Sequence, residues 1–443
     1  MSTEAQLKAG DVETIFRAPF DTFGLRALPL SDPLRSMYLL GIKKDPDVAA
    51  KKEILVARVD AEGRPDTGFG TGGIASASID FPGWDALGLG MVATDDGGVI
   101  AAFRDDAGVS TLGLVRFKND GSLDQTFGTG GVVIHDIFGA RSDANPTKPR
   151  QRDTLTLPFQ EAFASGSRGE IAPAKGRGLY FAWNTGPGGR EGGLLRTKSD
   201  GSIDTSFGDN GYVEVYYPGS SQTIPRGVQE LSDRSVIVVG SIHLPGKKAA
   251  VAARFNERGK LDPAFGTNGF FVLRGEDVPE PSLDGLFFTA AGEAPNEAIV
   301  FSGHMTVSGS QTYGLLAATD HSGQPLASFN GGKPVVFGLL GGTVESFADG
   351  GLIVQDDGKI VAGGYSALQN APPVDMLVVR FLPNGKVDTT FASPRGWVKI
   401  RPLGNEYNYL YGVSLTSDGK ILVAGDAGRD GTDVIAAVVR ISS

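Results

Sequence analysis

The 443-residue chain contains no cysteine, which excludes disulfide bonds, thiolate metal sites and cysteine nucleophiles together. It also lacks any run of about 18 or more apolar residues, the length that crosses a membrane as a helix. Its first residues include no hydrophobic core of the kind that a secretory signal needs. We therefore expect a soluble protein that is cytoplasmic or is secreted without a Sec leader.

Basic residues are in the minority, and the net charge is −10. A surface with this charge repels nucleic acids and anionic membranes, so we expect no nucleic-acid partner and no membrane insertion. Glycine, in contrast, is abundant, and its 64 residues are about twice the usual share of roughly 7%. Many glycines stand in Asp-Gly, Asn-Gly and Gly-Gly pairs, which are typical of β-hairpins.

One motif recurs along the chain, and its clearest copy runs from Gly201 to Gly208 with the sequence Gly-Ser-Ile-Asp-Thr-Ser-Phe-Gly. The aspartate can accept hydrogen bonds from the backbone N–H groups two and three residues further on, and the last glycine can take the positive φ that ends a turn. Burial of the phenylalanine would stabilise the fold by roughly 1.5 to 3 kcal/mol. We call this sequence the marker motif. Its copies contain the pairs Asp66 and Phe69, Asp124 and Phe127, Asp204 and Phe207, Asp262 and Phe265, and Asp388 and Phe391.

A further copy, the fifth in chain order, has Leu326 in place of the aspartate and keeps Phe329. A ring of marker aspartates could bind metal ions or a substrate. The copy with Leu326 favours a structural role instead, because the phenylalanine persists where the carboxylate is absent. We predict that the marker motif caps a turn and fixes it to the core.

The markers are about sixty residues apart, and four short runs rich in valine and isoleucine lie within an interval. Four strands repeated at such a period are typical of a β-propeller blade. We therefore predict an all-β fold, a single seven-bladed β-propeller over residues 12–442, with six or eight blades as alternatives and a flexible N-terminus at 1–11. The predicted blades are 12–60, 73–118, 131–199, 211–256, 269–319, 333–382 and 396–442. The ring could close by packing of whole blades or by a shift of the N-terminal strand.

Two more stretches accompany the markers. The sequence Leu-Val-Arg-Phe at 114–117 precedes the marker at 121–128, and a hairpin sequence Asp-Gly-Lys-Ile-Val-Ala-Gly lies at 357–363. With these stretches the chain resembles the bacterial delta-sixty repeat family over nearly its whole length. The resemblance implies a β-propeller of largely unknown function and brings no catalytic residues with it.

The third predicted blade departs from the pattern, because it carries extra residues between 138 and 177 with a local excess of basic side chains. Long insertions in repeat proteins often lie on the binding face. A composition rich in Ser, Pro and Gly also suits a solvated loop. Arg177, Trp183 and Arg190 are candidates for binding a sugar or an anion, and the alternative for Trp183 is packing between blades.

His243 and His304 each follow a strand-ending glycine, so we expect them on the same rim of adjacent blades. Together with a carboxylate they could share a metal ion, but no His-Glu-x-x-His motif supports such a site. The Asp-x-Asp-x-Asp-Gly pattern of calcium loops is absent as well. We predict no cofactor, although a calcium ion bound by backbone carbonyls in the central channel would leave no trace in the sequence.

No Gly-x-Ser-x-Gly motif is present, and the sequence favours no enzyme class. The leading hypothesis is a non-catalytic binding module whose loops or channel mouth recognise a protein, a glycan or a small ligand. The first alternative is a metal-assisted propeller hydrolase or lyase. The second is a secreted lectin-like or toxin-associated factor. The sequence specifies neither the ligand nor the oligomeric state.

Overall fold

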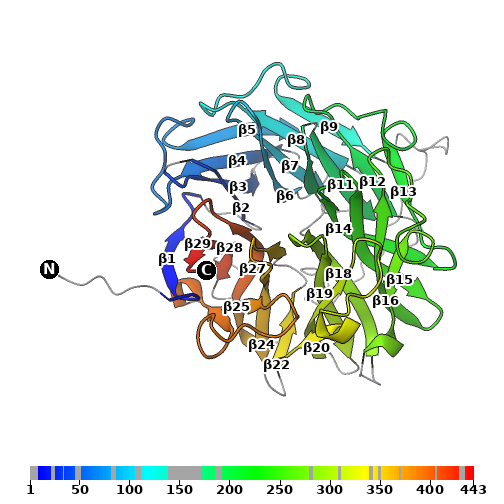
Figure 1. The fold of residues 1–443 in the computed structure, drawn as a ribbon. Coiled ribbons are helices and arrows are strands. Elements are labelled where there is room, and N and C mark those ends of the chain that lie inside the picture. Colours follow the sequence, from blue (N-terminus) through cyan, green and yellow to red (C-terminus); the bar gives the residue numbers. More distant parts are fainter. Residues whose placement is uncertain are drawn as a thin grey trace.

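The computed structural model is a ring of β-sheets arranged around a central axis (Figure 1). It describes residues 8–20, 25–32, 34–44, 51–80, 86–105, 111–137, 171–176, 178–184, 192–278, 283–307, 311–338, 343–347, 351–368, 371–404, 407–428 and 435–443. The strands are short and rich in β-branched residues, as in the sequence VIVVGSIHL of Val236–Leu244, and such side chains favour extended backbone. The predicted all-β fold is confirmed.

Five sheets in the described part of the chain each contain four antiparallel strands in chain order. The first sheet consists of β2 (Arg26–Pro29), β3 (Met37–Lys44), β4 (Lys51–Val59) and β5 (Ile74–Asp80), and the second of β6 (Ala86–Ala93), β7 (Val99–Asp105), β8 (Thr111–Phe117) and β9 (Val132–Asp136). The third consists of β10 (Ile171–Ala174), β11 (Gly178–Asn184), β12 (Gly192–Arg196) and β13 (Tyr212–Val215). The fourth consists of β14 (Gln222–Glu230), β15 (Val236–Leu244), β16 (Lys247–Phe255) and β17 (Phe270–Leu273), and the fifth of β18 (Leu283–Glu293), β19 (Ile299–Val307), β20 (Gln311–Thr319) and β21 (Val335–Phe337).

The remaining strands form one nine-stranded sheet that contains both ends of the chain. Its strands are β22 (Thr343–Ser346), β23 (Leu352–Val354), β24 (Ile360–Leu368), β25 (Ala371–Phe381), β26 (Trp397–Ile400), β27 (Tyr407–Leu415), β28 (Ile421–Gly428), β29 (Ile435–Ile441) and β1 (Val12–Arg17). The group β22–β26 joins the group β27–β29 through the parallel pair Val374 and Tyr407. The ring closes where β1 pairs antiparallel with β29, so the shift of the N-terminal strand is the alternative that the structure adopts.

The predicted blade bounds group the strands differently from the sheets. From the second onward, each predicted blade begins with the run that follows a marker, but that run is the last strand of the preceding sheet. For example, β13 follows the marker of the third repeat and pairs with β12. The reason is the marker turn itself, in which the N–H of Asp204 donates to the carbonyl of Arg196 and folds the chain back along the strand that it has just left.

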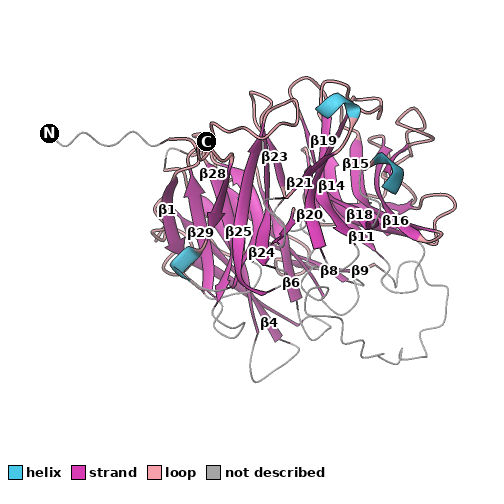
Figure 2. Cartoon of the chain, turned by 90° about the horizontal axis from the view of Figure 1, so that it is seen from below, coloured by secondary structure: helices cyan, strands magenta, loops and turns pink. Residues whose placement is uncertain are grey.

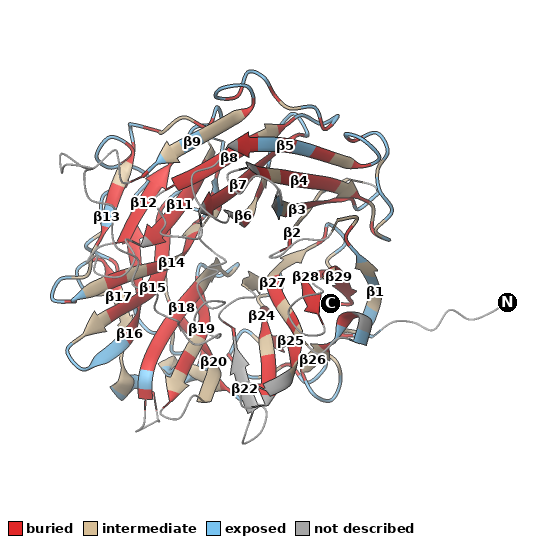
Figure 3. Ribbon diagram, turned by 180° about the vertical axis from the view of Figure 1, so that it is seen from behind, coloured by how far each residue is buried: buried red, intermediate tan, exposed pale blue. Residues whose placement is uncertain are grey.

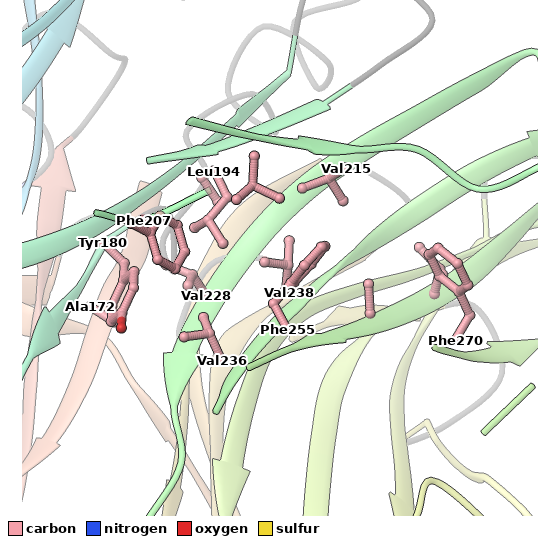
Figure 4. Packing of buried hydrophobic residues seen from close by; sticks show 14 of the residues in the cluster. Ala172, Tyr180, Leu194, Phe207, Val215, Val228, Val236, Val238, Phe255 and Phe270 are labelled. Carbon is pink, nitrogen blue, oxygen red and sulfur yellow. The ribbon is translucent and has the colours of Figure 1, made fainter. Parts of the chain in front are cut away.

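The hydrophobic core is divided among the interfaces between neighbouring sheets. The cluster between the third and fourth sheets contains Tyr180, Phe207, Val238 and Phe255 (Figure 4). Buried residues follow the strands, whereas exposed residues gather in the turns and at the outer rim (Figure 3). A marker phenylalanine therefore belongs to the seam between two sheets, which fixes one sheet against the next.

Helical structure in the described residues is limited to short 3-10 turns in the connections between strands (Figure 2). They are η2 (Gly275–Asp277), η3 (Asn330–Gly332) and η4 (Pro402–Gly404). Among the described residues, no helix has the length and apolar character needed to cross a membrane.

Candidate functional site

The marker aspartates bind within their own turns and to an arginine of the preceding strand. One oxygen of Asp204 accepts hydrogen bonds from the backbone N–H and the hydroxyl of Ser206, at 3.1 and 2.6 Å. Its other oxygen accepts one from Nε of Arg196, at 2.8 Å. Burial alone would raise the pKa of Asp204, but the hydrogen bonds from Ser206 and the charge of Arg196 hold it below its usual value.

The arginine is the partner that the marker motif does not contain. The guanidinium carbon of Arg196 lies 4.6 Å from the ring centre of Phe207, which is fully buried. The same arrangement joins Arg58 to Asp66 and Arg380 to Asp388, in each case eight residues apart. The spacing of eight residues between an arginine and the marker aspartate is a sequence signal from which this ion pair could have been predicted. The contacts give the marker residues a structural role at the seams.

The two candidate histidines lie near the ends of second strands in neighbouring sheets. His243 of β15 stands opposite Lys248 of β16. His304 of β19 stands opposite Phe287 of β18, and the two rings stack with centroids 4.5 Å apart and planes 12° apart. The ring of Phe287 is thus the surface against which His304 is held.

Two cationic side chains lie against the same ring. The guanidinium carbon of Arg226 is 5.4 Å from the ring centre of Phe287, and Nζ of Lys248 is 5.6 Å from it. Arg226 is the extra residue of a β-bulge in β14, and a bulge redirects the side chain that it carries. We call this group the Phe287 cluster; it consists of Arg226, His243, Lys248, Phe287 and His304.

Both imidazoles of the Phe287 cluster are neutral at pH 7. Burial, and then the charges of Arg226 and Lys248, lower the pKa of His304 to about 3. The pKa of His243 is lowered by burial and by the same two cations. Among the described residues, Nε2 of His243 and Nδ1 of His304 are buried without a hydrogen-bond partner. A buried polar atom left in this state costs roughly 1 to 3 kcal/mol, so a ligand that satisfies it would gain that amount.

The structure therefore brings His243 and His304 near the same two cations. In the part of the chain that the structure describes, no group of three or more His, Asp or Glu side chains is placed to hold a metal ion. Arg226, Lys248 and Phe287 were not among the predicted site residues. Their contribution depends on a bulge and on pairing across strands, which no local motif signals.

The other predicted site residues do not join this cluster. Trp183 is 1% exposed, stacks on Phe181 with centroids 5.8 Å apart and packs edge-on against Tyr212. It belongs to the hydrophobic cluster between the second and third sheets. Arg177, Arg190 and residues 138–170 of the predicted insertion at 138–177 lie outside the described residues. Within that insertion Ile171–Ala174 form β10, so this part belongs to the third sheet.

The comparisons with known proteins agree with this architecture. A family model described as a β-propeller domain of unknown function, DUF5122, matches residues 99–127, 355–391 and 416–443. These stretches include the markers at Asp124 and Asp388. No curated protein sequence matches the chain. The sheets and the family match together establish a β-propeller fold.

Solved structures resemble the chain in fold. A protein of unknown function from Dyadobacter fermentans has a TM-score of 0.44 and 10% identity, over 97% of this chain and 99% of that one. The polysaccharide lyase Uly1 has a TM-score of 0.50 and 10% identity, over 100% of this chain and 94% of that one. A quinohemoprotein alcohol dehydrogenase from Pseudomonas putida HK5 has a TM-score of 0.39 and 12% identity, over 98% and 76%. At such identities the likeness concerns the fold alone.

Proposed function

We propose that this β-propeller is a non-catalytic binding module that recognises an anionic group at the Phe287 cluster. The observation that carries the proposal is the gathering of Arg226 and Lys248 beside two partnerless imidazole nitrogens in a protein whose net charge is −10. Arginine and lysine bind carboxylate, sulfate and phosphate oxygens through charge-assisted hydrogen bonds. An acidic glycan or a small organic acid presents this chemistry.

The arrangement suits an anion because two cationic side chains lie beside two buried imidazole nitrogens that have no hydrogen-bond partner among the described residues. The charges of Arg226 and Lys248 both act to keep His243 and His304 neutral, as the lowered pKa values record. An anion between these groups would offset the repulsion and accept hydrogen bonds from the imidazole N–H groups. Since the anion would also favour the charged imidazoles, binding would raise the pKa of both histidines.

A catalytic role suits the cluster less well. A general base works best when its pKa lies near the operating pH, and His304, with a pKa of about 3, is a weak base at neutral pH. Uly1 is a polysaccharide lyase, but at 10% identity its likeness to this chain concerns the fold and not the chemistry. Binding without turnover is therefore the simpler use of these residues.

Isothermal titration calorimetry at low salt tests the proposal. The probes are a uronate oligosaccharide, a sulfated oligosaccharide and a neutral oligosaccharide of the same length. We expect saturable binding of at least one anionic probe and none of the neutral one. The double variant Arg226→Gln/Lys248→Gln should weaken binding about tenfold or more, the effect of losing charge-assisted hydrogen bonds.

Lys260→Gln is the matched control, because Lys260 is an exposed lysine of the same repeat outside the cluster. It should leave the affinity unchanged. Equal affinity for all three probes, or an anionic probe that binds the double variant as tightly as the parent, would contradict the proposal. Conversion of a probe to a shorter or unsaturated product would contradict its non-catalytic part.

We further propose that the nine-stranded sheet represents two blades, β22–β26 and β27–β29 with β1, which makes seven blades in all. The support is the antiparallel pairing within each group and the parallel pair Val374 and Tyr407 between them. We also propose that the repeats are of the delta-sixty type, on the marker aspartate and phenylalanine that five copies of the motif share. A cryo-electron microscopy map or a crystal structure would count the blades directly.

A further inference from the structure

One position is an arginine in six of the seven third strands of the described repeats. Each of these arginines pairs across the sheet with a residue near the start of the second strand. The pairs are Tyr38 and Arg58, Ile100 and Arg116, Tyr180 and Arg196, Ile237 and Arg254, Val361 and Arg380, and Leu422 and Arg440. In the fifth sheet the same register pairs Val300 with Ala318.

The arginine at this position fills the seam and reaches the next repeat. Arg196 is 1% exposed, lies over Phe207 and donates through Nη1 to the carbonyl of Glu257, at 2.7 Å. Arg58 donates in the same way to the carbonyl of Asn119, at 2.8 Å. These bonds join one sheet to the turn that follows the third strand of its neighbour.

The fifth repeat has lost both members of the ion pair, since Ala318 stands for the arginine and Leu326 for the aspartate. A cavity of about 280 Å³ lies there, bounded by Ala318, Leu326 and Phe329. We call it the Phe329 pocket. Its other walls include Val300 and Ile360, so the interior is apolar.

The rim of the Phe329 pocket is acidic. Asp356 and Asp357 of the β23–β24 turn line it, and no basic side chain appears among its described lining residues. Asp357 accepts a hydrogen bond from the amine of Lys359, whereas Asp356 is exposed and makes no ion pair within the described residues. An apolar interior with an aromatic wall and a free carboxylate at the mouth complements a cation on an apolar stem.

We propose that the Phe329 pocket binds a small organic cation that carries a guanidinium group on an alkyl stem, in the place that an arginine side chain takes in the other six repeats. The ring of Phe329 offers the face that Phe207 offers to Arg196. Guanidinium is preferred over ammonium because it is more weakly hydrated and stacks on aromatic faces. An apolar cavity of roughly 150 Å³ already suffices to bind benzene, so the space here admits such a ligand.

This site is independent of the Phe287 cluster. It lies at the hairpin end of β18 and β19, near Ala298, whereas Phe287 and His304 lie toward the other end of the same two strands. The two proposed ligands have opposite charge. Failure of either proposal therefore leaves the other intact.

Calorimetry or ligand-observed NMR with n-butylguanidinium, n-butylammonium and n-butanol tests the inference on the full chain. We expect saturable binding in the order butylguanidinium, butylammonium, butanol. Ala318→Arg should abolish binding, because the new side chain fills the pocket. Asp356→Asn should weaken it several-fold at an exposed position where misfolding is not expected, and Asp95→Asn, at the equivalent turn position of the second sheet, should not change it.

The inference is overturned if butylguanidinium does not bind, or if butanol binds as tightly, since the pocket would then recognise only apolar surface. Unchanged binding by the Asp356→Asn variant, or by a folded Ala318→Arg variant, would overturn it as well. Far-UV circular dichroism establishes that each variant is folded before it is titrated.

Discussion

The third and fifth repeats differ at two positions that meet in the fold. The third repeat has Arg196 and Asp204 there, and the fifth has Ala318 and Leu326. In both, the N–H of the second residue donates to the carbonyl of the first, at 2.9 Å in the third repeat and 3.0 Å in the fifth. The marker turn thus forms without the ion pair, and the phenylalanine is the part that both repeats need.

The largest effect should come from the phenylalanine. Phe207→Ala removes a fully buried ring and should lower the free energy of unfolding by about 3 to 5 kcal/mol. Phe329→Ala should cost about 1 kcal/mol less, because Ala318 offers its ring no guanidinium contact. Urea denaturation followed by tryptophan fluorescence measures both. Equal losses would show that the guanidinium contributes nothing to the seam.

The ion pair gives the next effect. Arg196→Ala leaves the carboxylate of Asp204 without its cationic partner and should cost about 3 kcal/mol, as breaking a buried pair does. Arg196→Ala combined with Asp204→Leu copies the fifth repeat, so its loss should be smaller than the sum of the two single losses. We expect a coupling energy of about 1 to 3 kcal/mol in the double-mutant cycle. Additive losses would contradict the pairing.

The same comparison shows what the sequence could reveal. The marker turns and their buried phenylalanines follow from a local motif, and the short Val- and Ile-rich runs predict the strands. The sheet to which a run belongs does not follow from the local sequence. The run after each marker pairs with the strand that precedes the marker, because the marker turn reverses the chain. Closure through β1 and β29 joins residues at opposite ends of the sequence, which a repeat pattern cannot specify.

The candidate site was predictable only in part. The expectation that Gly240 and Gly303 end strands was wrong, because both lie inside β15 and β19. The structure nevertheless places His243 and His304 near the same two cations. Their chemistry was not foreseen, because it depends on Arg226 at a bulge and on a lysine across the strand. The Phe329 pocket becomes visible only when Ala318 is aligned with six arginines through strand pairing.

The smallest effect should be the change of stability in acid, which tests the charge of the marker carboxylate directly. The folded-state pKa of Asp204 lies below its usual value, so its contribution to stability is present above about pH 3.8 and is lost as the pH falls through the folded value. Asp204→Asn should therefore flatten the decline in melting temperature below pH 4. The lowered pKa of His304 also reduces the stability of the protein as the pH falls from 6.5 toward 3. This contribution is the same in the parent and the Asp204→Asn variant, so it cancels in their difference.

Leu326→Asp supplies the opposite case in the fifth repeat, where the new carboxyl has no arginine beside it. Burial without a cationic partner acts to raise the pKa of the new carboxyl, whereas hydrogen bonds from Ser328, two residues on, act to lower it as those from Ser206 do for Asp204. The loss of stability in acid that this carboxyl causes should therefore be shallower than the one that Asp204 causes. Adding Ala318→Arg should make it steeper, because the arginine lowers the pKa of the carboxyl further. Parallel pH profiles for Leu326→Asp with and without Ala318→Arg would mean that the arginine does not set the state of the marker carboxyl.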